Sequence, residues 1–171
     1  GGPGARCRGA GAGHPRGGEM FGNEGEGLGG EGTPVGGYEK NRFEGSNTRT
    51  DVLFAFFGYN ESYAGQAGLD KFRQELTEWI RHTLAQKYNG TSAPRIVLFS
   101  PIAHEDLKNP DLPDGRENNQ RIALYTSAMA DVSRAEGITF VDLFKPSAAL
   151  YASAKQPLTM QGVHLTAEGN R

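Results

Sequence analysis

The chain has 171 residues, of which 36% are hydrophobic and 22% are charged, and its formal net charge is -2. This length suits one domain of ordinary size, and the near-neutral balance gives no electrostatic reason to expect a nucleic acid or an acidic membrane surface as a partner. No apolar run approaches the roughly 18 residues that a membrane span needs. The single cysteine, Cys7, excludes an internal disulfide and a zinc site built on several thiolates.

Residues 1–50 differ in composition from the rest of the chain. They hold 17 of the 25 glycines and almost no aliphatic residues beyond Leu28 and Val35. Such a segment cannot bury enough apolar area to offset its backbone entropy, which predicts a disordered, low-complexity segment. Two alternatives stay open: a flexible interaction tail, and translation of GC-rich DNA in the wrong frame, which also yields an excess of Gly, Arg, Ala and Pro.

From Asp51 onward the pattern is that of a folded domain, residues 51–171. Short apolar runs alternate with longer segments whose apolar residues recur every three or four positions, and this alternation predicts an α/β layered fold with a parallel sheet and helices on its faces. In chain order we expect a strand at Val52–Phe57, a helix at Leu69–Tyr88, a strand at Arg95–Pro101, a helix at Glu117–Glu136 and a strand at Ile138–Phe144. We also expect Phe54, Phe56, Phe57 and Trp79 in the core.

The first expected strand stops at Gly58, and Asn60 follows two residues later. Ligands bind at the carboxyl ends of the strands in open parallel sheets, so this turn is a candidate site. A glycine permits a sharp turn, and an asparagine amide donates hydrogen bonds without carrying charge, which suits a developing oxyanion. The alternative is that Asn60 only caps a turn.

Near the other end of the chain, the sequence GVHLT places His164 just before Thr166, where Thr166 is expected to cap a final helix. A loop histidine there is a candidate general base because it titrates near neutrality. The alternative is an ordinary surface histidine.

Taken together, these blocks resemble the SGNH hydrolases, also called GDSL esterases/lipases. The resemblance covers roughly Asp51 to Arg171 and rests on the G-x-N after a strand, on Asn119 and Tyr125 along the second helix, on ITFVDLF, and on GVHLTAEG. It implies a three-layer, flavodoxin-like fold and hydrolysis of carboxylic esters through an acyl-enzyme. By resemblance, Asn60 and Gly58 serve the oxyanion, Glu61 fills the acidic position of the G-x-N block, and His164 is the base.

The sequence departs from the family pattern in two places, which implies that the domain is incomplete in this chain. The family's nucleophile is the serine of a G-D-S block that ends the first strand, and no G-D-S occurs here. Ser46 lacks the preceding apolar strand that such a serine needs. The family's acid lies three residues before the histidine, where this chain has the neutral Gln161.

The first functional hypothesis is therefore an acyl-ester hydrolase that lacks an identifiable nucleophilic serine. The second is an inactive SGNH-like domain that binds an acylated carbohydrate or a similar ligand, and the third is a scaffold without a small-molecule role. The expected partner is a small-molecule or carbohydrate ester, with no cofactor, no metal, no nucleic acid and no membrane span. Relatives of this kind are often exported, but no residue pattern here indicates a compartment or an oligomeric state.

Two polar segments carry less specific signals. His104, Glu105 and Asp106 follow the second strand, and a solvated loop at the rim of the pocket is the favoured interpretation over a metal site, because three adjacent residues cannot all face one ion. Asp142 is interpreted as a strand terminus rather than as a carboxylate of the site.

Overall fold

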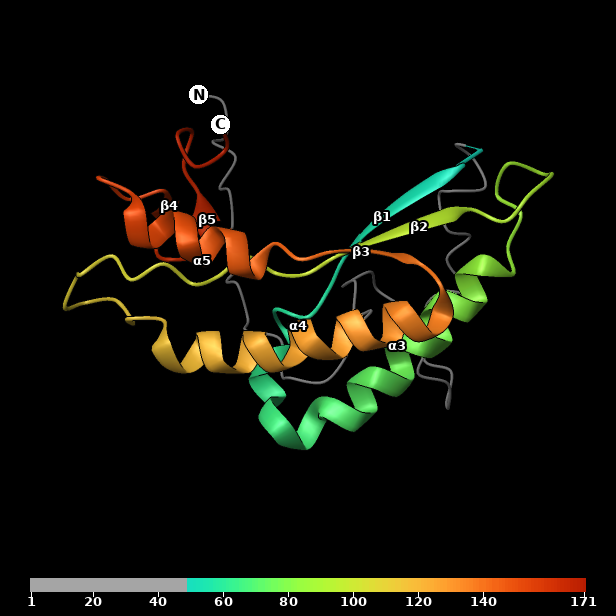
Figure 1. Ribbon diagram of the computed structural model, residues 1–171, viewed down its shortest axis with the longest axis horizontal. Coiled ribbons are helices and arrows are strands. Elements are labelled where there is room, and N and C mark those ends of the chain that lie inside the picture. Colours follow the sequence, from blue (N-terminus) through green and yellow to red (C-terminus); the bar gives the residue numbers. More distant parts are fainter. Residues whose placement is uncertain (1–48) are drawn as a thin grey trace, which may run out of the picture.

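Three apolar runs form the central sheet of the computed structural model, which describes residues 49–171. Strands β1 (Val52–Phe56), β2 (Arg95–Phe99) and β3 (Thr139–Val141) are all parallel and lie in the order β1-β2-β3 (Figure 1). The α/β class with a parallel sheet is thus confirmed. Each strand ends one to three residues earlier than predicted, because the following residues turn away at the carboxyl edge.

Two amphipathic helices connect the strands. Helix α3 (Leu69–Leu84) joins β1 to β2, and helix α4 (Arg116–Glu136) joins β2 to β3. Helix α4 ends where the sequence predicts, because Gly137 adopts a left-handed conformation (φ 69°) that a glycine accommodates without strain.

Helix α3 is shorter than the predicted Leu69–Tyr88. The N–H of Ala85 is shared among the carbonyl groups of residues 81–83, and the N–H of Gln86 donates to Thr83 O at 3.1 Å. These bonds of the tighter 3₁₀ type close the last turn and end the helix there.

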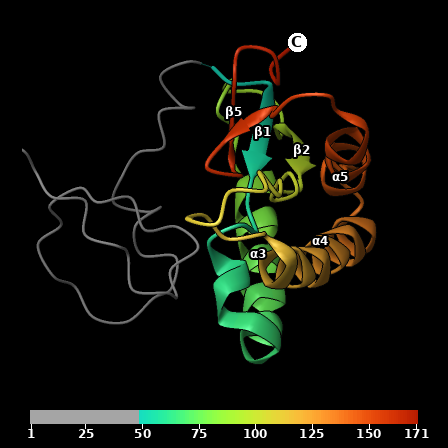
Figure 2. The same cartoon turned by 90° about the vertical axis from the view of Figure 1, so that its left-hand side faces the viewer.

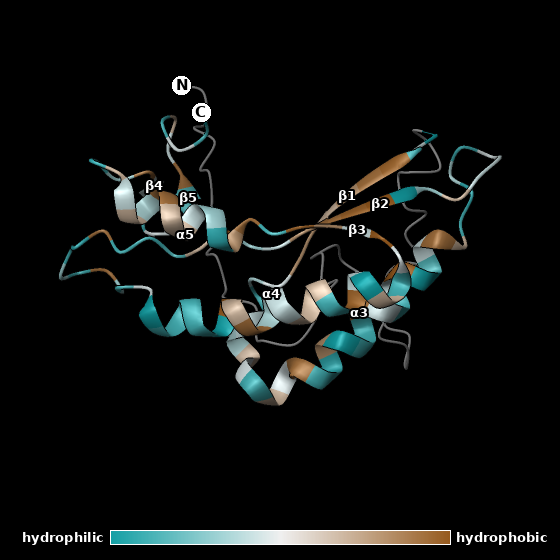
Figure 3. Ribbon diagram, in the orientation of Figure 1, coloured by the Kyte–Doolittle hydropathy of each residue, from teal (hydrophilic) through white to brown (hydrophobic). Residues whose placement is uncertain are grey.

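Both helices pack on one face of the sheet. Along β1 and β2, the buried side chains of this face alternate with exposed or partly buried side chains of the opposite face. Figure 2 shows α3 and α4 on the same side of the strands, and Figure 3 shows that β1 and β2 are among the most hydrophobic segments. The core contains Leu53, Ala55, Leu69, Phe72, Leu76, Trp79, Ile80, Ile96, Leu98, Tyr125, Ala128, Met129 and Val132.

The prediction of core positions is confirmed for Trp79, which is 1% exposed and meets Phe57 edge-on at 4.9 Å between ring centroids. It is wrong for Phe54 and Phe56, each of which is 63% exposed. Side chains of a strand alternate between faces, and these two point away from α3 and α4, where Phe56 stacks on Phe99. Within residues 49–171, the helices that pack on the sheet cover one face rather than the expected two.

The carboxyl edge of the sheet carries elements that the sequence analysis does not predict. They are a 3₁₀ helix η1 (Glu61–Gly68), helix α5 (Phe144–Ser153) and a hairpin of β4 (Thr159–Met160) and β5 (His164–Leu165). In Figure 1 the segments that follow β2 and β3, including α5 and the hairpin, extend toward the same side of the molecule.

The helix expected to begin at Thr166 is replaced by a single turn. The Thr166 hydroxyl accepts the N–H of Gly169 at 3.1 Å, as an N-cap would, and Asn170 N–H donates to Thr166 O. The capping interaction is therefore present, but no helix follows it within the described residues.

None of the helices in residues 49–171 combines the length and the apolar composition that a membrane span requires. The predicted disordered segment, with Cys7 and Ser46, lies outside the described residues except for Arg49 and Thr50.

The end of β1 at Gly58 has a steric cause that the sequence alone does not reveal. Gly58 has φ +99°, and a Cβ atom there would lie 2.8 Å from Met129 Sδ and 3.4 Å from Pro101 Cδ. Only a residue without a side chain can turn the chain this close to α4 and to the segment after β2.

We therefore expect Gly58→Ala to lower the free energy of unfolding by about 2–3 kcal/mol, since it adds contact with Met129 to the strain of a positive φ. Gly90→Ala is the matched control, because Gly90 has φ +84° but no atom within 4 Å of the added Cβ, and it should cost about 1 kcal/mol. Urea unfolding of both variants measures the difference. Equal losses would show that close packing does not fix this turn.

Candidate active site

The turn after β1 is held by hydrogen bonds to its own residues. The Glu61 carboxylate accepts the N–H of Gly58 at 2.8 Å, and the Ser62 hydroxyl donates to the carbonyl oxygen of Tyr59 at 2.6 Å. Burial raises the pKa of Glu61 above its ordinary value, and the bond from Gly58 opposes that rise. The acidic residue of the G-x-N block therefore locks the turn.

Asn60 lies exposed in this turn, at the start of η1, and its side chain forms no cap hydrogen bond. The alternative that Asn60 serves only as a cap thus finds no support. The N–H of Gly58 donates to Glu61, so in this conformation Gly58 shapes the turn and does not offer its N–H to a ligand. Asn60 keeps an amide group available for a ligand.

Tyr59, between these two residues, points toward α4. Asn118 Nδ2 donates to the Tyr59 hydroxyl at 3.1 Å, and Tyr63 lies 3.4 Å from it. Burial, together with Tyr63, raises the pKa of Tyr59 to about 12, so this hydroxyl is neutral at physiological pH and acts as a hydrogen-bonding group rather than as a base.

His104 is the centre of a buried polar cluster. Asn118 Nδ2 lies 3.2 Å from His104 Nδ1, so the amide donates to an unprotonated ring nitrogen. Asn119 holds the backbone of the same residue twice, since its Oδ1 accepts His104 N–H and its Nδ2 donates to His104 O, both at 2.8 Å. Two successive asparagines of α4 therefore fix both the ring and the backbone of His104.

Two glycines make room for the His104 ring. A Cβ atom on Gly115 would lie 2.6 Å from His104 Cδ2, and one on Gly162 would lie 2.3 Å from His104 Nε2. Burial lowers the pKa of His104 below its ordinary value despite the opposing charges of Asp114 and Asp106. The ring is thus a neutral packing and hydrogen-bonding element between α4 and the segment that carries His164.

The expectation of a solvated loop at residues 104–106 is therefore wrong. His104 is 9% exposed and Glu105 is 6% exposed, because the chain after β2 passes beneath the hairpin instead of along the surface. Among the described residues, no group of three His, Cys, Asp or Glu side chains is placed to hold a metal ion. The usable signal in the sequence was their position in the loop that follows a parallel strand, which is where sites form.

His164 lies exposed on β5, paired with Met160 of β4. The chain reverses through Gln161 and Gly162, which both have positive φ values (56° and 84°), as a type I′ turn requires. Gln161, in the position of the family's acid, is exposed.

A chain of contacts links the two predicted parts of the site. Tyr59, next to Asn60, is bonded to Asn118, which is bonded to His104, and the His104 ring packs against Gly162, two residues from His164. A cavity of about 580 Å³ lies between the loop 103–108, α5 and residues 154–157, and His104 lines it whereas Asn60 and His164 do not. The structure links their supporting turns, and their shared role stays a prediction.

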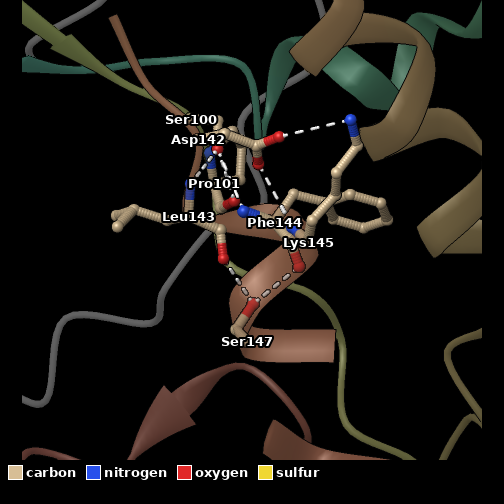
Figure 4. Close-up of polar contacts among 7 residues, drawn as sticks. All are labelled: Ser100, Pro101, Asp142, Leu143, Phe144, Lys145 and Ser147. Carbon is tan, nitrogen blue, oxygen red and sulfur yellow. Dashed lines mark hydrogen bonds and ion pairs between the residues drawn. The ribbon is translucent and has the colours of Figure 1, made fainter. Parts of the chain in front are cut away.

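Two serines at the carboxyl edge, the buried Ser100 and the partly buried Ser147, do not serve as nucleophiles in this arrangement. Figure 4 shows Ser100 Oγ accepting the N–H groups of Leu143 and Phe144 while it donates to Pro101 O, so its donor and both acceptor sites are used. Ser147 Oγ donates to the carbonyl groups of Leu143 and Phe144 and accepts the N–H of Ala103. Both hydroxyls hold β2, β3 and α5 together.

Asp142 has a structural role beside these serines. Its carboxylate accepts the N–H of Lys145 at 3.1 Å, in the first turn of α5, and lies 3.8 Å from Lys145 Nζ (Figure 4). It starts a helix, in agreement with its interpretation as a strand terminus.

The sequence model of the GDSL-like Lipase/Acylhydrolase family matches residues 2–171, a longer range than the blocks of Asp51–Arg171 that carry the resemblance. No curated protein sequence matches the chain.

Two solved structures illustrate the fold. A variant of an acetyl-xylooligosaccharide esterase from Geobacillus stearothermophilus is 14% identical, with a TM-score of 0.56, and the match covers 79% of this chain and 60% of that one. A lipase/acylhydrolase from Enterococcus faecalis is 21% identical, with a TM-score of 0.53, and the match covers 78% and 62%. The chain therefore spans about three-fifths of these neighbours, and the likeness agrees with the predicted flavodoxin-like arrangement.

The buried neutral His104 predicts a pH dependence of stability. Because its folded pKa lies below the unfolded value, the unfolded chain binds more protons as the pH falls below about 6.5. The contribution of neutral His104 to the free energy of unfolding is therefore fully present above about pH 6.5. Below that pH it is lost, by at most about 1.4 kcal/mol per pH unit.

Urea unfolding at pH 7.5 and 5.5 checks this expectation. The loss of stability on acidification should be smaller in His104→Gln, which keeps an acceptor for Asn118 but does not titrate. The same loss in both proteins would show that His104 is not its source.

Proposed function

Because the chain belongs to the GDSL-like Lipase/Acylhydrolase family, we propose that it carries the oxyanion donor and the general base of an acyl-ester hydrolase. Asn60 would donate its side-chain amide to the oxyanion of the tetrahedral intermediate, and His164 would take the proton of the attacking hydroxyl and return it to the leaving alcohol. Water would then attack the acyl-enzyme, with His164 taking a proton from the water and returning it to the departing nucleophile as the carboxylic acid is released, without a cofactor.

The observation that carries this proposal is the uncapped side chain of Asn60 at the carboxyl edge of the sheet. The turn around it is locked by Glu61, Ser62 and the glycine conformation at Gly58, yet the Asn60 amide is not used to hold the turn. A rigid turn that presents an unused donor is the preorganised arrangement that stabilises developing charge.

The substrate class follows from the family and from the names of the structural neighbours. Those neighbours are an acetyl-xylooligosaccharide esterase and a lipase/acylhydrolase, so a small-molecule or carbohydrate ester is the proposed substrate. The exposed positions of Asn60 and His164 suit a substrate that approaches from solvent.

The mechanism has no assigned nucleophile. The sequence has no G-D-S block, Ser46 lies outside the described residues, and the hydroxyls of Ser100 and Ser147 are used in structural bonds. Removing the serine of a protease triad costs about a million-fold in turnover, so a chain without a nucleophile would show no measurable hydrolysis.

The lack of an identifiable nucleophilic serine favours a second candidate function. A domain that keeps the locked turn at Asn60 and the hairpin at His164 but lacks a nucleophile would bind an acylated carbohydrate without cleaving it. A fluorophosphonate probe separates the two candidates, because it labels an activated serine and leaves an inactive domain unmodified.

For the hydrolase, we expect the probe to label one serine of the 171-residue protein, identified by peptide mass mapping, and His164→Ala to abolish the labelling. Asn60→Ala should lower kcat for p-nitrophenyl acetate by about 10²–10³-fold, as the loss of an oxyanion donor does elsewhere. Gln66→Ala, which removes an exposed amide from the same 3₁₀ helix, is the matched control and should leave kcat unchanged.

Absence of both labelling and turnover would contradict the hydrolase proposal. In that case, binding of an acetylated xylo-oligosaccharide, measured by calorimetry and weakened by Asn60→Ala, would support the second candidate. Absence of binding as well would contradict both functions.

A further inference from the structure

We propose that Glu105 is a positioning residue that holds the hairpin bearing His164 in place. The inference rests on the proposed function for the role of His164, but its structural part stands on contacts that do not depend on catalysis. Neither the family resemblance nor the sequence pattern assigns a role to Glu105.

The Glu105 carboxylate is a buried acceptor for one end of the hairpin. Both of its oxygens lie 3.1 Å from Leu158 N, and its Oε2 accepts Thr159 N–H at 2.7 Å and the Thr159 hydroxyl at 2.6 Å. Leu158, Thr159 and Glu105 are 8%, 3% and 6% exposed, so water does not compete strongly for these groups. The bonds fix the entry to β4.

The backbone of the same residue holds the other end of the turn. Glu105 N–H donates to Gly162 O at 2.9 Å, and the ring of the preceding His104 packs against Gly162. Met160 pairs with His164, and Thr159 pairs with Leu165. Glu105 therefore contacts the hairpin both before β4 and in the turn between the strands, and His164 follows the second contact by two residues.

This anchorage matters because the hairpin is not part of the main sheet. Strands β4 and β5 form a separate two-stranded sheet, and an isolated two-stranded hairpin is marginally stable in water. Its remaining support includes Leu158 O, which accepts the N–H and the hydroxyl of Thr166 within the same segment. Glu105 links the hairpin to the body of the domain, because it directly follows His104, which Asn119 fixes to α4.

The chemistry at this point requires a carboxylate. Two backbone N–H groups and one hydroxyl converge on it, and an ionised carboxylate offers acceptors only. A glutamine would keep one acceptor oxygen but would replace the other with an NH₂ group. Of the three donors, only the Thr159 hydroxyl can also accept a hydrogen bond from that NH₂ group, and the backbone N–H groups cannot. The hairpin should therefore loosen in the order wild type, Glu105→Gln, Glu105→Ala.

Amide hydrogen exchange of the full chain tests this role without reference to activity. In Glu105→Ala, exchange at residues 158–165 should accelerate about 10- to 100-fold, the factor expected when buried donors lose their acceptor, while exchange in α3 and α4 stays unchanged. Glu136→Ala is the matched control, because it removes a carboxylate that binds Arg81 far from the hairpin and should leave residues 158–165 protected.

Two exchange results would overturn the inference: unchanged protection of the hairpin in Glu105→Ala, or an equal loss of protection in α3 and α4. If Glu105→Ala does not fold, Thr159→Val provides the test, since it removes the hydroxyl donor and keeps the backbone N–H. It should accelerate exchange at the hairpin by a smaller factor of about 3- to 10-fold. Full hairpin protection in Thr159→Val would then count against the inference.

Kinetics separate a positioning role from a purely structural one. With p-nitrophenyl acetate, Glu105→Ala should lower kcat at least 10-fold with KM within about 2-fold, and Glu105→Gln should restore part of kcat. Faster hairpin exchange with unchanged kcat would overturn the positioning of a base by Glu105. If the wild-type protein has no turnover, the proposed hydrolase function fails, and hydrogen exchange alone decides whether Glu105 holds the hairpin.

Discussion

The segment His104–Glu105, in the loop that follows β2, is the constraint on which the carboxyl edge of this molecule depends. Asn118 and Asn119 fix His104 to α4, and Glu105 carries the hairpin with its carboxylate and its N–H. Because His104 is only 9% exposed and Glu105 only 6% exposed, each lost bond would leave a buried polar group unpaired. The His104 ring and the Glu105 carboxylate therefore hold the elements of the carboxyl edge in place through their hydrogen bonds.

A second constraint acts at the end of β1. Close approach to Met129 and Pro101 requires a glycine at position 58, and the Glu61 carboxylate closes the turn on its N–H. The residues of the G-x-N-[DE] block thus have distinct physical roles in this chain. The glycine turns the chain, the acid accepts a hydrogen bond that closes the turn, and the asparagine keeps its side-chain amide available for a ligand. The same strand leaves Phe54 and Phe56 exposed on the face opposite to α3 and α4.

The elements of the fold that follow from local pattern were predictable. The apolar runs, the period of α3 and the stop at Gly137 depend on nearby residues, so the parallel α/β class could be read from them. The burial of His104 and Glu105 could not, because it depends on where residues 158–162 return in space. The exposure of Phe54 and Phe56 could not be predicted for a related reason, because an apolar run does not reveal which face of the sheet is covered. Asn60 and His164 were identified by resemblance, and their shared role remains the central claim.

The spatial relation of Asn60 and His164 is the most direct test of that claim. A nitroxide attached at position 164 in a Cys7→Ser, His164→Cys protein would broaden the NMR signals of nearby amide groups. The account predicts that the Asn60 side-chain amide is strongly broadened, whereas the amide of Asn89, which bonds to Asp51 at the opposite end of β1, stays sharp. A sharp Asn60 signal beside a labelled position 164 would contradict a common site for the two residues.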